Sequence, residues 1–196
     1  MKNFKYDTSK FNEHPINVVL FVSRNKDNSQ IEGFKERRRS FITHEPIDSE
    51  VLKTKFAEFV YSGVPGELCR FYYSINERDP EKIHKFLIHF LIDNEDFNIC
   101  DIQPKLASIA AKKECARSKR WMFDFDIDDD ALVNEFIEDI KAIDSSVEVN
   151  KYKTPHGYGV IVSHGFDTRT LYEKWDRSKT ECKKDDLMCI DWKIKK

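Results

Sequence analysis

The stretch RWMFDFDID, residues 120–128, alternates large apolar residues with aspartates. Successive side chains of a β-strand point to opposite faces of the sheet, so the apolar residues would cover a core while the acidic residues share the other face. Those acidic residues are Asp124, Asp126 and Asp128. Because like charges close together on one face repel each other, a divalent cation there would be stabilising. The stretch therefore predicts a β-strand, and it raises the hypothesis of a metal site on its polar face.

Further regular elements are expected after this strand. In chain order they are a helix over about 129–143, strands over 147–153 and 158–163, a helix over 168–176 and a strand over 187–194. The order βαββαβ is that of the ferredoxin-like or RRM-like fold. In such a sheet we expect the last strand beside the first strand, with the third strand on the other side of the first.

The last expected strand carries Asp191 on its polar face, because apolar residues alternate with it. The expected topology would place Asp191 beside Asp124 or Asp126. Carboxylate oxygens on adjacent strands suit Mg²⁺ or Mn²⁺, which take the rest of their ligands from water and from the phosphates of a nucleotide. We therefore interpret Asp124, Asp126 and Asp191 as candidate metal ligands and as candidate catalytic residues for two-metal phosphoryl transfer.

The N-terminal part of the chain is expected to form a mixed α/β unit. Its expected elements are strands over 16–24, 33–43 and 69–79 and helices over 48–63 and 79–94. We divide the chain into an N-terminal α/β unit at 1–95, a helical connector at 96–117 and an RRM-like unit at 118–196, which together make an α+β protein.

Two segments supply candidate phosphate-binding side chains. RFYYSINER, residues 70–78, contributes Arg70, Ser74, Asn76 and Arg78, and Tyr72 is available for base stacking. The hairpin KTPHGYG, residues 153–159, contributes Lys153 and His156 beside glycines that allow a close approach of the backbone to phosphate. Together these residues would form one nucleotide-sized pocket.

These segments together resemble the archaeo-eukaryotic primase superfamily, which includes the primase-polymerases. The resemblance rests on FDFD at 123–126, on the hairpin at 153–159 and on the late strand with Asp191. It implies an RRM-like palm that binds nucleotides with a divalent metal and transfers nucleotidyl groups on single-stranded or template nucleic acid. SINERD, SKRWMFDFDID and KTPHGYGVIVSHGFD also resemble segments of small uncharacterised phage-encoded proteins, over about half of the chain.

One position departs from the family pattern. Hairpins of this kind carry a phosphate-binding histidine after the Gly-Tyr pair, where this chain has Gly159. His156 or His164 would have to take its place, or polymerising activity would be lost. The departure therefore leaves open a non-catalytic phage-type accessory or inhibitor protein that binds nucleic acid or a host protein.

Composition and charge limit the classes of protein to consider. The 33 basic residues nearly balance the 35 acidic ones, so any binding of nucleic acid must be local. Fifteen Phe and seven Tyr against six Gly argue for an ordered globular protein. Five cysteines without a CxxC pair suggest neither a disulfide framework nor a zinc site. With no signal peptide or membrane span expected, we place the protein in the cytoplasm, which is the host cytoplasm if a phage encodes it.

Simpler interpretations of the acidic residues also exist. The aspartates at 128–130 fit the start of a helix, where they cap and complement the helix dipole. Asp124 and Asp126 could lie on an edge strand without a ligand, and Asp191 could be a solvated residue between lysines.

Simpler interpretations apply to the basic residues as well, and one rival enzyme class exists. The polar residues of 70–78 fit the wet face of a strand, and KERRR at 35–39 fits a solvated edge. IDWK at 190–193 contains the Asp-x-Lys half of a metal-dependent nuclease motif, although two helices and two strands are expected between Asp126 and Asp191. We rank that nuclease below the primase-like interpretation.

Overall fold

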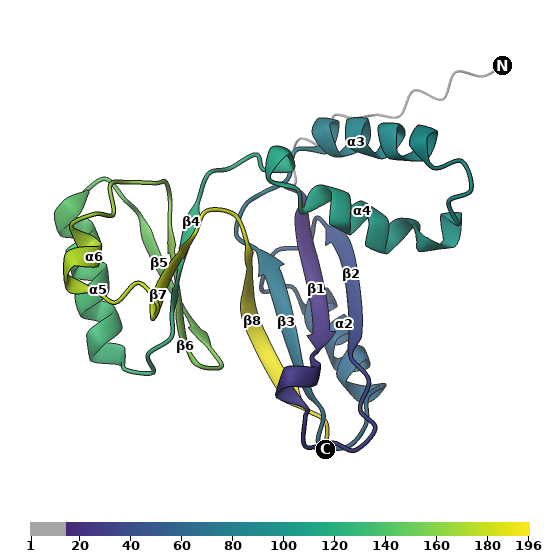
Figure 1. Cartoon of the computed structure of the whole chain (residues 1–196), viewed down its shortest axis with the longest axis horizontal. Coiled ribbons are helices and arrows are strands. Elements are labelled where there is room, and N and C mark those ends of the chain that lie inside the picture. Colours follow the sequence, from purple (N-terminus) through teal and green to yellow (C-terminus); the bar gives the residue numbers. More distant parts are fainter. Residues whose placement is uncertain (1–14) are drawn as a thin grey trace.

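Two four-stranded antiparallel sheets make up the protein (Figure 1). This computed structural model describes residues 15–196, and most of the N-terminal segment in which we expected no signal peptide lies outside this range. The first sheet has the strand order β2-β1-β3-β8, and the second sheet has the order β5-β6-β4-β7. Helices pack beside both sheets, so the expected α+β class is confirmed.

The elements have the following bounds. The first sheet contains β1 (Asn17–Ser23), β2 (Arg37–Thr43), β3 (Leu68–Ser74) and β8 (Leu187–Ile194). The second sheet contains β4 (Trp121–Phe125), β5 (Val149–Thr154), β6 (Gly157–Val162) and β7 (Thr180–Lys183). The α-helices are α2 (Glu50–Tyr61), α3 (Pro80–Asp93), α4 (Ile102–Ala110), α5 (Asp130–Ile143) and α6 (Leu171–Lys174), and the short 3-10 helices are η1 (Asn25–Asp27), η2 (Ile99–Asp101) and η3 (Lys113–Cys115). Within residues 15–196, every helix is too short or too polar to cross a lipid bilayer.

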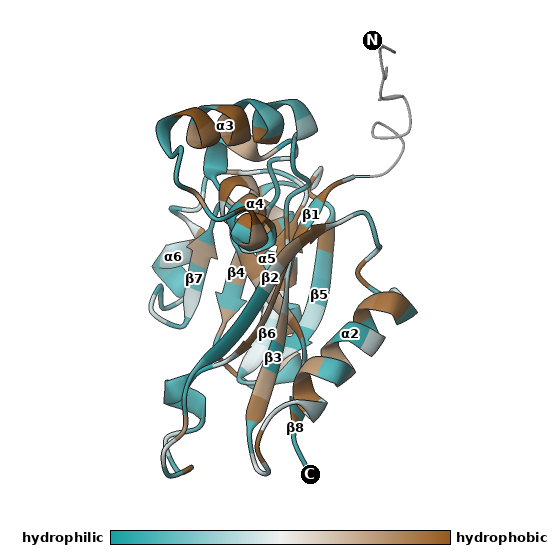
Figure 2. Cartoon of the chain, turned by 90° about the vertical axis from the view of Figure 1, so that its right-hand side faces the viewer, coloured by the Kyte–Doolittle hydropathy of each residue, from teal (hydrophilic) through white to brown (hydrophobic). Residues whose placement is uncertain are grey.

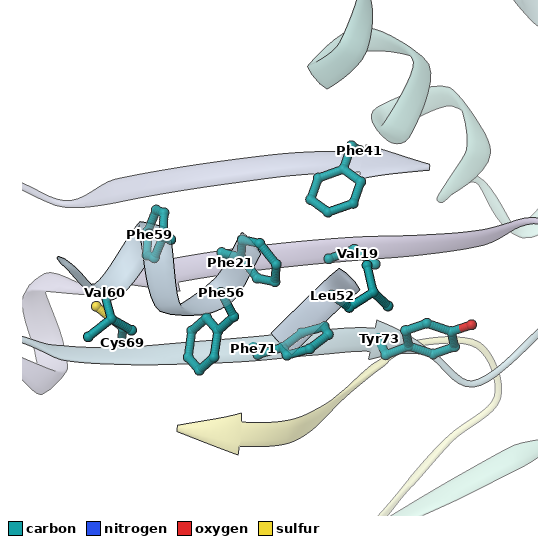
Figure 3. Packing of buried hydrophobic residues seen from close by; sticks show 10 residues of the cluster. All are labelled: Val19, Phe21, Phe41, Leu52, Phe56, Phe59, Val60, Cys69, Phe71 and Tyr73. Atoms are coloured by element: carbon teal, nitrogen blue, oxygen red, sulfur yellow. The ribbon is translucent and has the colours of Figure 1, made fainter. Parts of the chain in front are cut away.

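Helix α2 covers one face of the first sheet and forms an aromatic core with it (Figure 3). The ring centroid of Phe21 lies 4.9 Å from that of Phe71 and 5.3 Å from that of Phe56. Burying side chains of this size contributes about 1.5–3 kcal/mol each. Because Phe71 points toward α2, its neighbours Arg70 and Tyr72 are directed to the other face of the sheet, toward the second sheet.

The second sheet has the expected βαββαβ topology. Its first strand, β4, lies between the third strand, β6, and the last strand, β7. Helices α5 and α6 cover its outer face (Figure 1), where Phe123 and Phe125 of β4 are fully buried against Phe136 of α5. The expected aromatic core of RWMFDFDID is therefore confirmed, and its aspartates at 124 and 126 remain on the inner side of the sheet.

The last strand of the second sheet is not the strand that we expected. The strand at 187–194 exists as β8, but it pairs with β3 in the first sheet, where Asp191 lies opposite Phe71. The position beside β4 belongs to β7, a strand of only four residues. We missed β7 because such a short edge strand has room for only two core-facing side chains, Thr180 and Cys182, which make no recognisable pattern. The expected placement of Asp191 beside Asp124 or Asp126 is therefore wrong.

Helices α3 and α4 form a hairpin at one end of the first sheet. Helix α4 packs against β1 and β2 through a cluster that includes Ile16, Val18 and Ile109. Figure 2 shows that β2 is hydrophilic over its first half and hydrophobic at the end that meets α4. Within the charged half of β2, Arg38 lines the space between the two sheets, whereas Arg37 packs on the ring of Phe59 in α2.

A glycine at the start of β6 is required by close packing of backbone against backbone. A Cβ atom on Gly157 would overlap with the carbonyl oxygen of Phe125 and would lie 2.9 Å from the amide nitrogen of Ile127. We expect Gly157→Ala to lower the free energy of unfolding by about 1–3 kcal/mol, because neither backbone group can move without opening the β4–β6 ladder. Urea unfolding monitored by circular dichroism measures this loss.

Gly159→Ala is the matched control for this prediction, because its Cβ would meet the flexible end of a side chain, the sulfur of Met188 at 2.8 Å. We expect Gly159→Ala to lower the free energy of unfolding clearly less than Gly157→Ala does. Equal losses for the two variants would contradict the role that we assign to Gly157.

A charged cleft between the two sheets as candidate functional site

A cleft of about 450 Å³ lies between the inner faces of the two sheets. One wall comes from β1, β2, β3 and β8 of the first sheet and from the segment after β1, and the other comes from β4, Lys183 of β7 and the turn between β5 and β6. The two sheets touch through a small apolar cluster of Ile75, Met122, Ile161 and Met188, and Met122 and Met188 also line the cleft. The cleft is therefore built from residues far apart in the sequence, and each wall can be described by its charge.

The wall from the second sheet is acidic. Asp124 and Asp126 both line the cleft, and Asp124 is half-buried opposite Gly159 on one neighbouring strand and Glu181 on the other. Burial and the nearby Asp124 carboxylate raise the pKa of Asp126, and electrostatic interactions with His156 and Lys183 oppose this rise. Among residues 15–196, no hydrogen bond or ion pair reaches the Asp126 carboxylate, so this group is available to a cation.

A lysine from β7 is the cation nearest to this acidic wall. The Nζ atom of Lys183 lies 2.9 Å from Oδ2 of Asp124 and 3.5 Å from Oδ2 of Asp186, which also lines the cleft. It lies 3.8 Å from Oε2 of Glu181. The Asp124 carboxylate is therefore partly neutralised by the protein itself, whereas the Asp126 carboxylate is not.

The wall from the first sheet is basic, with Arg24, Lys26, Arg38 and Arg70 lining the cleft. Arg70 is only 4% exposed. Its Nη2 atom donates to Oδ1 of Asp27 at 2.7 Å and to Nε2 of His156 at 3.1 Å. Its Nε atom is buried without a hydrogen-bond partner among the residues that the structure describes. These four cations on one wall give the cleft a positive side that attracts anions.

Asp27 holds two of these arginines in place. Arg24 donates to it from Nε at 2.8 Å and from Nη2 at 3.1 Å, in addition to the bond from Arg70. Burial alone would raise the pKa of Asp27, but the hydrogen bonds from Arg24 and Arg70 outweigh that effect and lower it. Asp27 is therefore ionised and fixes the positions of both guanidinium groups on the basic wall.

Two of the expected phosphate-binding residues, Arg70 and His156, meet in the cleft. His156 extends from the β5–β6 turn and accepts the hydrogen bond from Arg70, so the two walls touch at this point. Lys153, from the same turn, instead pairs with Asp128 and lies over the ring of Tyr158, 4.3 Å from its centroid. The structure thus leaves Lys153 outside the residues that line the cleft.

The other three expected phosphate-binding residues are buried in protein contacts. Ser74 Oγ accepts from Val18 N at 3.0 Å. Asn76 accepts from Arg120 N at 2.7 Å and is 1% exposed. Arg78 Nη1 donates to Oδ2 of Asp185 at 2.8 Å, with 1% of the Arg78 side chain exposed. Ser74, Asn76 and Arg78 do not face the cleft; Asn76 and Arg78 connect the two sheets instead.

The third expected metal ligand also lies elsewhere. Asp191 belongs to β8, where its Oδ1 accepts from Trp192 N at 2.8 Å and its Oδ2 lies 3.6 Å from Nζ of Lys193. Asp191 is paired with Phe71 of β3, so both side chains lie on the same face of the sheet, toward α2 and away from the cleft. The structure therefore separates Asp191 from Asp124 and Asp126.

The acidic residues after β4 begin a helix, as the simpler interpretation holds. Oδ1 of Asp129 accepts hydrogen bonds from the first amides of α5, Ala131 N at 2.8 Å and Leu132 N at 3.1 Å. Asp130 pairs with Lys151 at 2.6 Å. These aspartates lie outside the cleft lining and need no metal ion.

Gly159 occupies the position at which the resemblance to primases would predict a histidine. It is paired with Asp124 and faces Met188 of β8, whose sulfur would lie 2.8 Å from a Cβ at this position. A histidine at 159 would therefore collide with Met188, which fills the space that such a ring would need. His156 lines the same cleft.

The sequence interpretation did not identify several residues that line the cleft, which are Arg24, Lys26, Arg38, Lys183 and Asp186, nor Asp27, which pairs with Arg24 and Arg70. A signal existed for Arg38, because strict alternation within KERRR places it on the face opposite Arg37, which packs on Phe59. Lys183 carried no such signal, because β7 itself was not expected.

The donor set fits a divalent ion only with ligands from outside the protein. Among residues 15–196, no three carboxylate, imidazole or thiol groups converge to hold a metal ion by themselves. Mg²⁺ commonly binds through one or two carboxylates and completes its shell with water and substrate phosphates. Asp124 and Asp126, opposite a basic wall that could hold phosphates, suit a site in which water and phosphates complete the shell of the ion.

Comparisons of the chain with protein-family models, with curated proteins and with solved structures found no match.

Proposed function

We propose that the protein binds a nucleoside triphosphate with Mg²⁺ or Mn²⁺ in the cleft between its sheets, as a primase-like nucleotidyltransferase would. The observation that carries this proposal is the pairing of opposite walls: Arg24, Lys26, Arg38 and Arg70 line one wall of a cleft whose other wall carries Asp124 and Asp126, and the Asp126 carboxylate has no partner among residues 15–196. A volume of about 450 Å³ is in the range of small-molecule sites.

The charges of the two walls support the same ligand. Phosphate oxygens would lie against Arg24, Lys26, Arg38 and Arg70, and the Nδ1–H group of His156 at the mouth of the cleft would add a further donor. Asp124 and Asp126 would hold the divalent ion, which supplies charge neutralisation on the phosphates. Tyr72, which also lines the cleft, offers a ring for the base.

A second candidate is a non-catalytic accessory protein that binds a nucleotide, nucleic acid or a host protein through the same cleft. Met188 beside Gly159 favours it, because a family histidine has no room there. The metal-dependent nuclease is disfavoured, because Asp191 and Lys193 lie in the first sheet, apart from Asp126. Of the two remaining candidates, only the first requires both a nucleotide and the metal.

Calorimetric titration with a non-hydrolysable nucleoside triphosphate, with and without Mn²⁺, tests the proposal. We expect saturable binding that Mn²⁺ strengthens, and we expect Lys26→Met with Arg38→Met to weaken it about tenfold, because two phosphate-facing charges are lost. Lys82→Met with Lys85→Met removes the same charge from α3, outside the cleft, and should leave the affinity unchanged. Equal affinity with and without Mn²⁺ would contradict the metal-dependent proposal.

A further inference from the structure

The segment between α4 and β4, residues 111–120, concentrates positive charge on the surface. Figure 1 shows it passing from α4 to β4 at the junction of the two sheets. It contains one acidic residue, Glu114, and five basic residues, all of them exposed: Lys112, Lys113, Arg117, Lys119 and Arg120. The charges of the whole chain nearly balance, so this excess is local. We call residues 111–120 the basic segment.

The protein supplies no counter-ions to the basic segment. Among residues 15–196, no carboxylate lies within ion-pair distance of any of its five cations, whereas Lys82 in α3 and Lys151 in β5 each pair with an aspartate. Exposed Lys184, directly after β7, also has no ion pair in this part of the chain and lies over the ring of Trp121, 4.7 Å from its centroid. Because like charges gathered on one surface repel each other, an anion from outside the protein would be stabilising there.

A buried asparagine holds the end of the basic segment beside Lys184. The Nδ2 atom of Asn76 donates to the carbonyl oxygen of Arg120 at 3.0 Å and lies 3.4 Å from that of Lys184. Its Oδ1 atom accepts from Ser118 Oγ at 2.9 Å and from Arg120 N at 2.7 Å. These backbone groups are thus satisfied inside the protein, so the cationic side chains lie on a surface that is ordered before a ligand arrives.

The chemistry of the basic segment fits the backbone of a nucleic acid. Protein interfaces have apolar and aromatic side chains at their centre, and helices that bind to a membrane surface insert such side chains. Within residues 111–120, no large apolar side chain is exposed. Lys and Arg alone suffice for a phosphate backbone, which is bound through charge. Residues 112–120 span at most about 30 Å, which leaves room for several phosphates of one strand.

We propose that the basic segment, together with Lys184, binds the phosphodiester backbone of a nucleic acid. Binding is independent of base sequence, because contacts to phosphates carry no sequence information. This surface is separate from the cleft, since neither the basic segment nor Lys184 lines it. Arg120 precedes Asp124 by four residues, about 13 Å along a strand, so a bound polynucleotide would pass close to the acidic wall. The proposal does not depend on what occupies the cleft.

Fluorescence anisotropy with labelled oligonucleotides of about 20 nucleotides, one single-stranded and one duplex, tests this proposal in the presence of EDTA. We expect saturable binding that weakens as the salt concentration rises. Arg117→Gln with Lys119→Gln and Arg120→Gln should weaken it at least about tenfold. The slope of log K against log salt should become shallower by about 2, because each phosphate contact to a single strand contributes about 0.7. The oligonucleotide that is bound more tightly identifies the form of the partner.

Lys53→Gln with Lys141→Gln and Lys179→Gln is the matched control. It removes the same charge from exposed positions on α2, on α5 and just before β7. We expect its affinity for both oligonucleotides to stay within about threefold of the wild type, because these positions lie outside the proposed surface and exposed ion pairs contribute little. Equal losses in the two triple variants would show that net charge alone controls binding and would overturn the proposal.

The outcomes separate this proposal from the proposed function. Oligonucleotide binding that the basic-segment variant weakens would support the proposal even if the wild type bound no nucleoside triphosphate. Binding that is lost in Lys26→Met with Arg38→Met but kept in the basic-segment variant would place the polynucleotide in the cleft and overturn the proposal. No binding of either oligonucleotide at low salt, or binding only to phosphatidylserine vesicles, would overturn it as well.

Discussion

Replacing Arg78 with methionine is expected to lower the free energy of unfolding by about 3–5 kcal/mol. The guanidinium of Arg78 donates to Asp185 at 2.8 Å, and only 1% and 9% of the two side chains are exposed. The substitution leaves the Asp185 carboxylate in a buried position without its counter-ion, whereas the methionine retains most of the apolar volume. The result would show that the RFYYSINER segment stabilises the junction of the two sheets.

Urea unfolding of the wild type and of Arg78→Met measures this loss. Lys82→Met is a suitable control, because its ammonium lies 3.8 Å from Asp79 on the surface and should contribute well under 1 kcal/mol. Arg78→Met with Asp185→Leu should recover part of the stability, since no buried charge then remains unpaired. A loss below about 1 kcal/mol in Arg78→Met would contradict a structural role for the pair.

The second large effect is expected at the acidic wall. Asp124→Asn with Asp126→Asn removes both carboxylates that would hold the divalent ion, so we expect the affinity for a nucleoside triphosphate in Mn²⁺ to fall about 100-fold. Without metal, affinity should rise or stay equal, because two negative charges that repel phosphate are gone. Calorimetry under both conditions separates the contribution of the metal from that of the basic wall.

Asp128→Asn with Asp130→Asn provides the matched control for this prediction. It removes the same charge a few residues later in the chain, from side chains that pair with Lys153 and Lys151 outside the cleft. We expect its nucleotide affinity in Mn²⁺ to stay within about threefold of the wild type, since exposed ion pairs contribute little. A loss of similar size in both double variants would indicate that general charge, and not the cleft wall, controls binding.

The sequence predicts the second unit well, because its signals are local. The alternation in RWMFDFDID separates Phe123 and Phe125, which are fully buried, from Asp124 and Asp126, which face the cleft. The order of helices and strands then identifies the βαββαβ topology. Only the last strand is misassigned, because β7 is short and polar while the next strand, β8, has the stronger apolar pattern.

The sequence predicts the residues of the cleft much less well. Alternation shows that Arg70 leaves the core of its sheet, but it cannot show that Asp27 and His156 meet it from 43 residues before and 86 residues after. The same limit applies to Asn76 and Arg78. Their side chains are of types that bind phosphate, but in the structure they make contacts that join the two sheets. Their role depends on β8 returning to the first sheet, which is a long-range pairing that no local pattern encodes.

The position of the bound ion is the central claim of this account, and paramagnetic broadening by Mn²⁺ in two-dimensional NMR spectra locates it directly. With a nucleoside triphosphate present, substoichiometric Mn²⁺ should broaden most strongly the amide signals of residues 124–126 and of the turn around His156. Strongest broadening at the exposed aspartates 128–130 or around Asp191, or broadening without any preferred residues, would contradict a metal site on the inner face of β4.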